Sequence, residues 1–142
     1  MKKVLVFGVF DMFHFGHMRL LKRAAKLGDY LIVAVQADDY VMKYKSSIGT
    51  IGALYSLKER MEMIRSLRCV DEVISYNDVD IDIKNVDFDI FIKGPDQVHK
   101  GYVAATKWCE EKGKKIVVLP RTEGISSTYI KHIISDLESK ND

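Results

Sequence analysis

Residues 4–24 read VLVFGVFDMFHFGHMRLLKRA, and this stretch decides the fold. It opens with an apolar run that has the length and the β-branched character of a buried strand, and the run breaks at Gly8. From about Phe15 the apolar residues recur at the i, i+3 and i+4 spacing of an amphipathic helix. His14 and His17 fall at this strand-to-helix junction, where an open parallel sheet binds ligands and a helix N-terminus offers N–H groups to an anion. We therefore expect the function to reside at the junction.

The rest of the chain continues the alternation of strands and helices. Further buried strands are predicted at residues 30–35, 69–75, 88–92 and 115–119, and helices after the capping box Ser56–Glu59, at 102–112 and at 125–137. Such alternation predicts a Rossmann-like α/β fold, with helices on both faces of a five-stranded parallel sheet of order 3-2-1-4-5. The 142 residues fit a single domain, residues 1–142.

Composition excludes several classes of protein. The chain is 47% hydrophobic and 30% charged, with a net charge of +2 and scattered basic residues, so we expect neither a nucleic-acid partner nor a membrane partner. No apolar run is long enough to cross a bilayer, and we predict a cytoplasmic protein. Cys69 and Cys109 are too few for a disulfide framework or a metal cluster, and we expect reduced thiols.

Two segments carry a resemblance to a known family. Residues 8–17, GVFDMFHFGH, resemble the G-x-F-D-x-x-H-x-G-H signature of the cytidylyltransferase family of small nucleotidyltransferases (the HxGH superfamily). Residues 121–128, RTEGISST, resemble its R-T-x-G-I-S-[ST]-[ST] signature. The similarity runs over nearly the whole chain and is closest to the bacterial glycerol-3-phosphate cytidylyltransferase group.

The resemblance implies an enzyme that transfers CMP from CTP to a small phosphate monoester and releases pyrophosphate. The acceptor would be a polyol, amino-alcohol or amino-acid phosphate, and the CDP-activated product would serve a surface polysaccharide or a teichoic-acid-type polymer. Mg²⁺ would accompany CTP, and the protein would be a homodimer.

The family signatures also imply site residues. Phosphoryl transfer asks the protein mainly for positioning and for stabilisation of charge on phosphoryl oxygens. The residues expected to do this as catalytic groups are His14, His17, Lys43, Lys45 and Arg121. The expected nucleotide-binding residues are Gly8, Val9, Phe10, Asp11, His14, Gly16, His17, Gly94, Asp96, Arg121, Thr122, Gly124, Ile125, Ser126, Ser127 and Thr128. No residue is assigned to a metal, because the two histidines have no third ligand of metal type nearby in the sequence.

The acceptor region departs from the nearest relatives. Where these carry a G-D-D-W-type run, this chain has KGPDQVHK at residues 93–100, and residues 46–53 also differ. Lys93, Gln97, His99 and Lys100 could bind an acceptor phosphate or read a polar group, so they are the predicted acceptor-binding residues. The departure predicts that glycerol 3-phosphate is not the preferred acceptor. The roles of four further family-matched residues are left open: Asp38, Arg60, Arg68 and Asp71.

Two other functions remain open. One is an adenylyltransferase of the same superfamily, which would transfer AMP from ATP to a sugar phosphate or to FMN. The other is a non-catalytic nucleotide-binding subunit. Both histidines and Arg121 are present, which argues against the second, because a mere binder has no need of donors that act in a transition state.

Overall fold

The computed structural model describes residues 1–37, 53–122, 124 and 126–141. Its strands are β1 (Lys3–Gly8), β2 (Tyr30–Gln36), β3 (Glu72–Tyr76), β4 (Ile90–Lys93) and β5 (Lys115–Val118). Its helices are α1 (Phe15–Ala25), α3 (Leu57–Arg65), α4 (Val79–Asp82), α5 (Lys100–Glu111) and α6 (Ser127–Asn141), with a 3₁₀ turn at Ile83–Asn85. The predicted segment with Lys43 and Lys45 lies outside the described residues.

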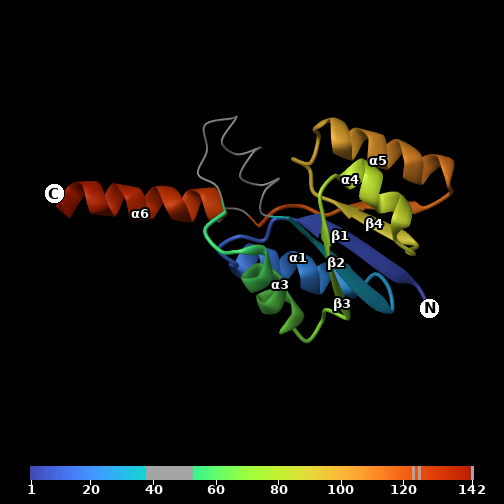
Figure 1. The fold of residues 1–142 in the computed structure, drawn as a ribbon, viewed down its shortest axis with the longest axis horizontal. Coiled ribbons are helices and arrows are strands. Elements are labelled where there is room, and N and C mark those ends of the chain that lie inside the picture. The colour runs from blue at the N-terminus through green and yellow to red at the C-terminus, as the bar shows by residue number, and fades with distance from the viewer. Residues whose placement is uncertain (38–52, 123, 125, 142) are drawn as a thin grey trace.

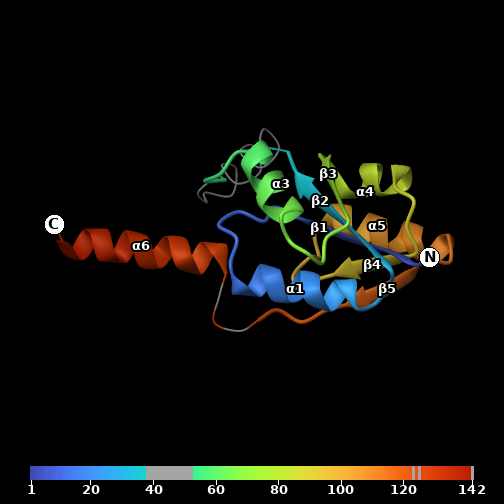
Figure 2. The same cartoon turned by 90° about the horizontal axis from the view of Figure 1, so that it is seen from below.

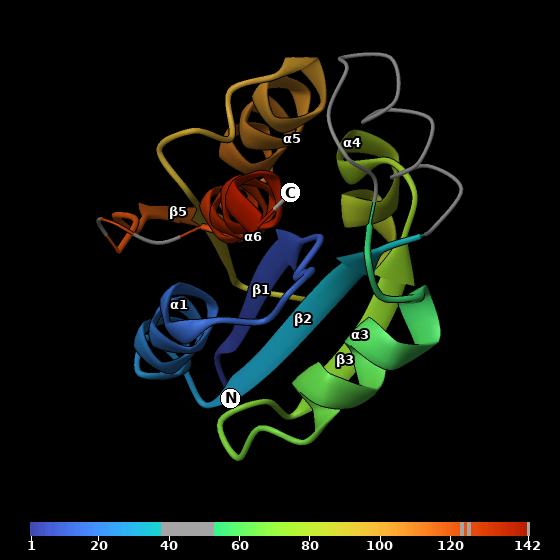
Figure 3. The same cartoon turned by 90° about the vertical axis from the view of Figure 1, so that its left-hand side faces the viewer.

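All five strands pair in parallel in the order β3-β2-β1-β4-β5 (Figure 1), which confirms the predicted sheet. Side chains alternate between the two faces of a strand. In β1, Val4 and Val6 therefore pack with Leu21 and Ile64, while Leu5 and Phe7 belong to a second cluster with residues of α4 and α5. Figure 3 shows the result along the sheet, with α1 and α3 on one face and α4 and α5 on the other.

Several element boundaries differ from the sequence-based expectation. Strand β3 begins at Glu72 rather than at Cys69, because the Asp71 carboxylate accepts the N–H of Leu31 at 2.7 Å and Asp71 donates its own N–H to the Leu31 carbonyl. These bonds align β3 with β2, so the open role of Asp71 is structural. Arg68 lies exposed in the preceding turn. The predicted capping box of α3 is confirmed, since Ser56 Oγ accepts the N–H of Glu59 and the Glu59 carboxylate accepts the N–H of Ser56.

Helix α6 extends away from the body of the protein in two perpendicular views (Figures 1 and 2). It starts at Ser127, two residues later than expected, and Ser126 Oγ accepts the N–H of Tyr129 at its first turn. In the described part of the chain, no helix is both long and apolar enough to cross a membrane.

Candidate functional site

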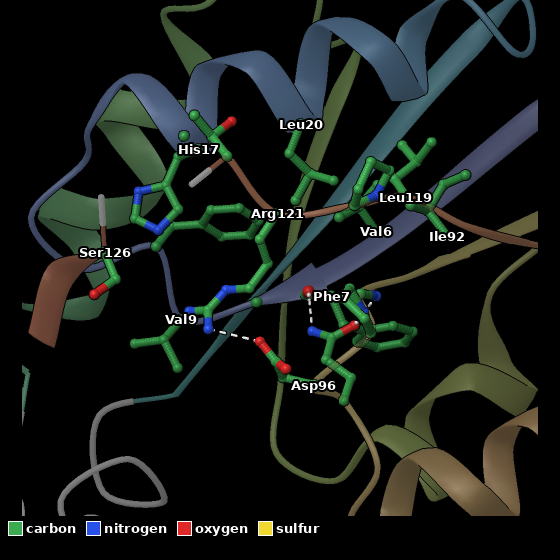
Figure 4. A pocket seen from close by; sticks show the side chains of 18 of the residues that line it. Val6, Phe7, Val9, His17, Leu20, Ile92, Asp96, Leu119, Arg121 and Ser126 are labelled. Carbon is green, nitrogen blue, oxygen red and sulfur yellow. Dashed lines mark hydrogen bonds and ion pairs between the residues drawn. The ribbon is translucent and has the colours of Figure 1, made fainter. Parts of the chain in front are cut away.

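A pocket of about 280 Å³ opens at the carboxyl ends of β1 and β4 (Figure 4). This is where the strand order reverses, and in an open parallel sheet the loops on either side diverge there and leave a crevice. Four segments line the pocket: the end of β1 with its loop, the first turns of α1, the loop after β4, and the stretch that leads from β5 to α6.

The loop after β1 has a strained backbone. Phe10 and Met12 both lie in the left-handed region, with φ of 55° and 48°, which costs a residue other than glycine about 1 kcal/mol or more. A Cβ on Gly8 would meet the Phe10 ring at 2.7 Å, so the absence of a side chain at Gly8 allows that ring to fold back and bury. The edge of the Phe10 ring then packs against His17, with 5.4 Å between ring centroids. The conformation of the loop thus brings the Phe10 ring against His17.

The two histidines are held by the backbone at the start of α1. Nδ1 of His14 accepts the N–H of Gly16 at 3.0 Å, and Nδ1 of His17 accepts the N–H of His14 at 3.3 Å. The rings stack with 3.8 Å between their centroids. A neutral imidazole carries one proton, so an Nδ1 that accepts a hydrogen bond places that proton on Nε2. Each ring therefore has an Nε2–H as its donor for a ligand.

Burial keeps both rings neutral. It is the main cause that lowers the pKa of His17 to about 3; the charges of His14 and Arg121 lower it further, against an opposing effect of Asp11. Burial, followed by the charge of Arg121, also lowers the pKa of His14. The site therefore presents neutral hydrogen-bond donors near pH 7, not imidazolium ions.

Asp11 belongs to this loop, and it is almost fully buried. It accepts the N–H of Leu54 at 2.8 Å and of Tyr55 at 3.1 Å, and forms an ion pair with Lys131 of α6 at 2.7 Å. Burial raises the pKa of Asp11, but the hydrogen bond and charge of Lys131 and the two backbone bonds outweigh it and hold that pKa below its usual value.

Arg60 is fully buried and joins three chain segments. Its guanidinium donates to the carbonyls of Val9 and Gln36, at the ends of β1 and β2, and to the carbonyl of Tyr55. The role of Arg60, which the sequence left undecided, is thus structural support of the site. A sequence signal existed, because Arg60 falls three residues after Leu57 and four before Ile64, on the apolar face of α3.

Arg121, in the stretch between β5 and α6, also lines the pocket and pairs with Asp96 at 2.6 Å (Figure 4). Both side chains are more than half exposed, so this ion pair contributes at most about 1 kcal/mol to stability. The guanidinium can therefore exchange the carboxylate for a phosphate at small cost.

The pocket brings together most of the residues expected to bind the nucleotide. Its lining includes Gly8, Val9, Phe10, Asp11, His14, Gly16, His17, Gly94, Asp96, Arg121, Thr122 and Ser126. Gly124 is not among the lining residues and has a φ of 79° in the turn before α6. Asp38, Lys43, Lys45 and Ile125 lie outside the described residues, and Ser127 and Thr128 are described only as the first residues of α6.

The predicted acceptor-binding residues differ in their position relative to the pocket. Gln97 lines the pocket, but its amide is not free to read a ligand as expected: Oε1 accepts the N–H of Gly94, and Nε2 donates to Tyr102 Oη at 2.9 Å and to the Phe7 carbonyl at 3.4 Å. His99 caps α5, where its Nδ1 accepts the N–H of Gly101. Lys93, His99 and Lys100 are not among the lining residues, so the pocket geometry gives their predicted role no support.

Sequence reasoning missed Lys131, Leu20, Leu119 and Pro120. The last three line the pocket with apolar surface. Lys131 carries no local signal, because its partner Asp11 is 120 residues away in the chain. Among the described residues, no group of three His, Cys, Asp or Glu side chains could hold a metal ion.

Comparison with known proteins identifies the family. The model of the cytidylyltransferase-like family matches residues 5–133, which span both signatures and every pocket residue. This chain belongs to the cytidylyltransferase-like family. The resemblance drawn from the two signatures is thereby confirmed.

Relatives within the family match over almost their full length. The glycerol-3-phosphate cytidylyltransferase of Bacillus subtilis is 39% identical over 140 residues, covering 96% of this chain and all of the relative. That of Staphylococcus aureus is 36% identical over 144 residues, covering 99% of this chain and all of the relative. A crystal structure of a lipopolysaccharide core biosynthesis protein from Thermoplasma volcanium is also similar. It superimposes with a TM-score of 0.67 and 27% identity, covering 86% of this chain and 97% of that protein.

Proposed function

We propose that this cytidylyltransferase transfers CMP from CTP to a small phosphate monoester, with release of pyrophosphate. The observation that carries the proposal is the pair of stacked, neutral histidines whose Nδ1 atoms are both occupied by backbone N–H groups. They line a pocket that Arg121 also lines. Fixed N–H donors and a guanidinium around one cavity suit a triphosphate, and the full-length relatives are named for this chemistry.

In the proposed reaction, an oxygen of the acceptor phosphate attacks the α-phosphorus of CTP. The bond from the α-phosphorus to the bridging oxygen of the β-phosphate breaks, and pyrophosphate leaves with the electron pair. The acceptor is already an anion, so no residue has to remove a proton. Nε2–H of His14 and His17 would donate to phosphoryl oxygens, and they matter most as negative charge builds up in the transition state.

Arg121 and the first turn of α6 would bind the phosphates that leave. Arg121 would exchange Asp96 for a phosphate, and Ser126 lies in the pocket lining where α6 begins. The N-terminus of a helix offers unpaired N–H groups and the positive end of the helix dipole to an anion.

We propose that Mg²⁺ enters with CTP. Magnesium in nucleotide sites is bound largely by substrate phosphates and water, with only one or two protein carboxylates. Asp11 is already engaged by Lys131 and two N–H groups, whereas Asp96 would be released once Arg121 turns to a phosphate. Asp96 is thus the described pocket carboxylate that fits the ion, which would supply further charge neutralisation to the phosphates.

The acceptor class is a small phosphorylated metabolite. We propose a polyol phosphate or a related amino-alcohol or amino-acid phosphate, because the relatives named above act on glycerol 3-phosphate. The CDP-linked product would then serve a surface polymer, and the reaction would take place in the cytoplasm.

We also propose that the protein is a homodimer. Tyr129, Ile133 and Leu137 recur every four residues on α6 and are each at least 40% exposed, on a helix that extends from the body (Figure 1). Exposed apolar surface of this kind favours association with a second copy. Sedimentation equilibrium at micromolar concentration should give twice the chain mass, and a monomer there would contradict the proposal.

The decisive experiment is a substrate screen. Wild-type protein is incubated with Mg²⁺, with CTP or ATP, and with a panel of phosphate monoesters, and pyrophosphate release and product mass are recorded. Formation of a CDP-linked product with at least one acceptor is expected. Turnover of ATP alone would identify an adenylyltransferase, and binding of CTP without turnover of any acceptor would indicate a non-catalytic subunit.

A further inference from the structure

Asp11 holds in place the strained loop that leads to the two histidines. Asp11 sits between Phe10 and Met12, the two residues in the left-handed region. Such a conformation persists only where the surroundings impose it. The Asp11 side chain provides those surroundings, because its carboxylate points away from the loop and is anchored from outside it.

Among the described residues, the anchors of Asp11 come from two separate parts of the chain. Two are the backbone N–H groups of Leu54 and Tyr55, just before α3. The third is the ammonium group of Lys131, in the second turn of α6, at 2.7 Å. Asp11 therefore connects the histidine loop both to the segment before α3 and to the helix that begins beside Ser126.

Lys131 is the charged member of this set. Its side chain is 11% exposed, and the carboxylate that it meets is 1% exposed. Arg60 donates its guanidinium to the carbonyls of Val9, Gln36 and Tyr55 and thereby also holds the segment before α3. A buried carboxylate that loses its cation is strongly disfavoured and reorganises or takes up a proton. The ion pair with Lys131 thus keeps Asp11 charged and in place.

We propose that Lys131 is a positioning residue for nucleotidyl transfer: through Asp11 it fixes the loop that aims His14 and His17, and it couples that loop to α6. The inference rests on the proposed function. Lys131 does not line the pocket, so it acts through Asp11 rather than on the nucleotide. Removing it should misplace the donors by fractions of an ångström, which lowers the rate of the chemical step more than substrate binding.

The kinetic test compares Lys131→Met, which keeps the aliphatic stem, with Lys131→Arg, which keeps the charge. Lys107→Met on α5 is the matched control, because Lys107 is exposed and is not among the residues that line the pocket. We expect Lys131→Met to lower kcat by about tenfold or more with KM for CTP within about threefold of wild type, since the donors act in the transition state. Lys131→Arg should recover most of the loss, and Lys107→Met should behave as wild type.

Other outcomes would contradict the positioning role. A raised KM for CTP with unchanged kcat would mean that Lys131 binds the nucleotide directly. Activity of Lys131→Met within about twofold of wild type would show that the pair does not position the site. If Lys131→Met does not fold, Lys131→Gln, which keeps a donor for Asp11 but no charge, takes its place in the comparison.

A second readout separates this inference from the proposed reaction. In ¹⁵N-labelled protein without substrate, long-range ¹H–¹⁵N spectra report the histidine tautomers, and hydrogen exchange reports the amides of Leu54 and Tyr55. We expect both rings of the wild type to carry the proton on Nε2, and Lys131→Met to lose this single tautomer and to exchange both amides faster. Unchanged ring signals and exchange rates in Lys131→Met would overturn the inference, even if CTP turnover is found. Altered signals would support it even if no acceptor is ever turned over.

Discussion

The ring of His14 and the ring of His17 stack at 3.8 Å, and each is fixed by a backbone N–H at Nδ1. The reciprocal bonds form the capping box of α1, in which His17 takes the place that a glutamate or glutamine usually occupies. The same bonds that begin the helix therefore choose the tautomer of both rings. The hydrogen bonds that cap α1 thus also leave an Nε2–H on each ring as a donor for a ligand.

Replacing His17 by alanine should remove one fixed donor. We expect kcat to fall by a factor that corresponds to about 3 kcal/mol, with a much smaller effect on CTP binding, because the donor is needed most in the transition state. Steady-state kinetics and calorimetric CTP binding measure the two effects. His132→Ala is the control, since His132 is exposed on α6. A loss of activity below about tenfold would contradict the assigned role.

The low pKa of His17 predicts how stability depends on pH. The pKa is about 3 in the folded protein and near 6.5 in the unfolded chain, so between these values the unfolded state binds more protons. The stability due to a neutral His17 is present above about pH 6.5 and is lost as the pH falls towards 3. Urea unfolding from pH 7 to 4 should show a steeper decline for wild type than for His17→Asn. Equal slopes would mean that His17 titrates normally.

Arg60 predicts a large effect on stability. Arg60→Met removes a buried guanidinium and leaves the carbonyls of Val9, Gln36 and Tyr55 short of a donor, which should cost about 3 kcal/mol. Arg65→Met on the same helix is the control, because Arg65 is exposed. Chemical denaturation measures both variants. Similar free energies of unfolding for the two would show that the Arg60 bonds contribute little.

Arg121 should affect binding rather than folding. Its partner Asp96 is exposed, so Arg121→Ala should change the free energy of unfolding by less than about 1 kcal/mol. A charged hydrogen bond to a phosphate contributes about 1.5–3 kcal/mol, so the same change should weaken CTP binding at least about tenfold. Isothermal titration measures the affinity. Unaltered CTP affinity would place the triphosphate elsewhere.

Features that depend on residues close together in the sequence could be predicted, whereas features that depend on contacts between distant segments could not. Strand order, the two-sided core and the histidine junction followed from local periodicity and from two short signatures. The neutral state of His17 and the Asp11–Lys131 pair did not, because they arise where segments distant in sequence meet. Gln97 shows the same limit: its sequence position suggested a ligand contact, but the fold uses its amide to join Gly94, Phe7 and Tyr102. Lys43 and Lys45, outside the described residues, stay predictions.

The last prediction concerns the acceptor, whose expected binding region at residues 93–100 reads KGPDQVHK. The segment follows the end of β4, and Gln97 joins it to the Phe7 carbonyl of β1 and to Tyr102 of α5. The wall of the pocket beside Gly94 and Asp96 is therefore shaped by Gln97, and Gln97→Ala should reshape it. We expect this variant to raise KM for the acceptor while leaving KM for CTP nearly unchanged.

His99→Ala, which alters the cap of α5 outside the pocket lining, should cost about 1 kcal/mol of stability and leave acceptor KM unchanged.

We expect glycerol 3-phosphate to be a poorer acceptor than another phosphate monoester. The polar groups that line an acceptor site discriminate between small acceptors. Competition between glycerol 3-phosphate and each member of the phosphate panel, scored as the ratio of kcat/KM values, measures the preference. Efficient use of glycerol 3-phosphate by the wild-type enzyme would contradict this prediction. It would show that the pocket wall held by Gln97 accepts glycerol 3-phosphate, the acceptor for which the Bacillus subtilis and Staphylococcus aureus relatives are named.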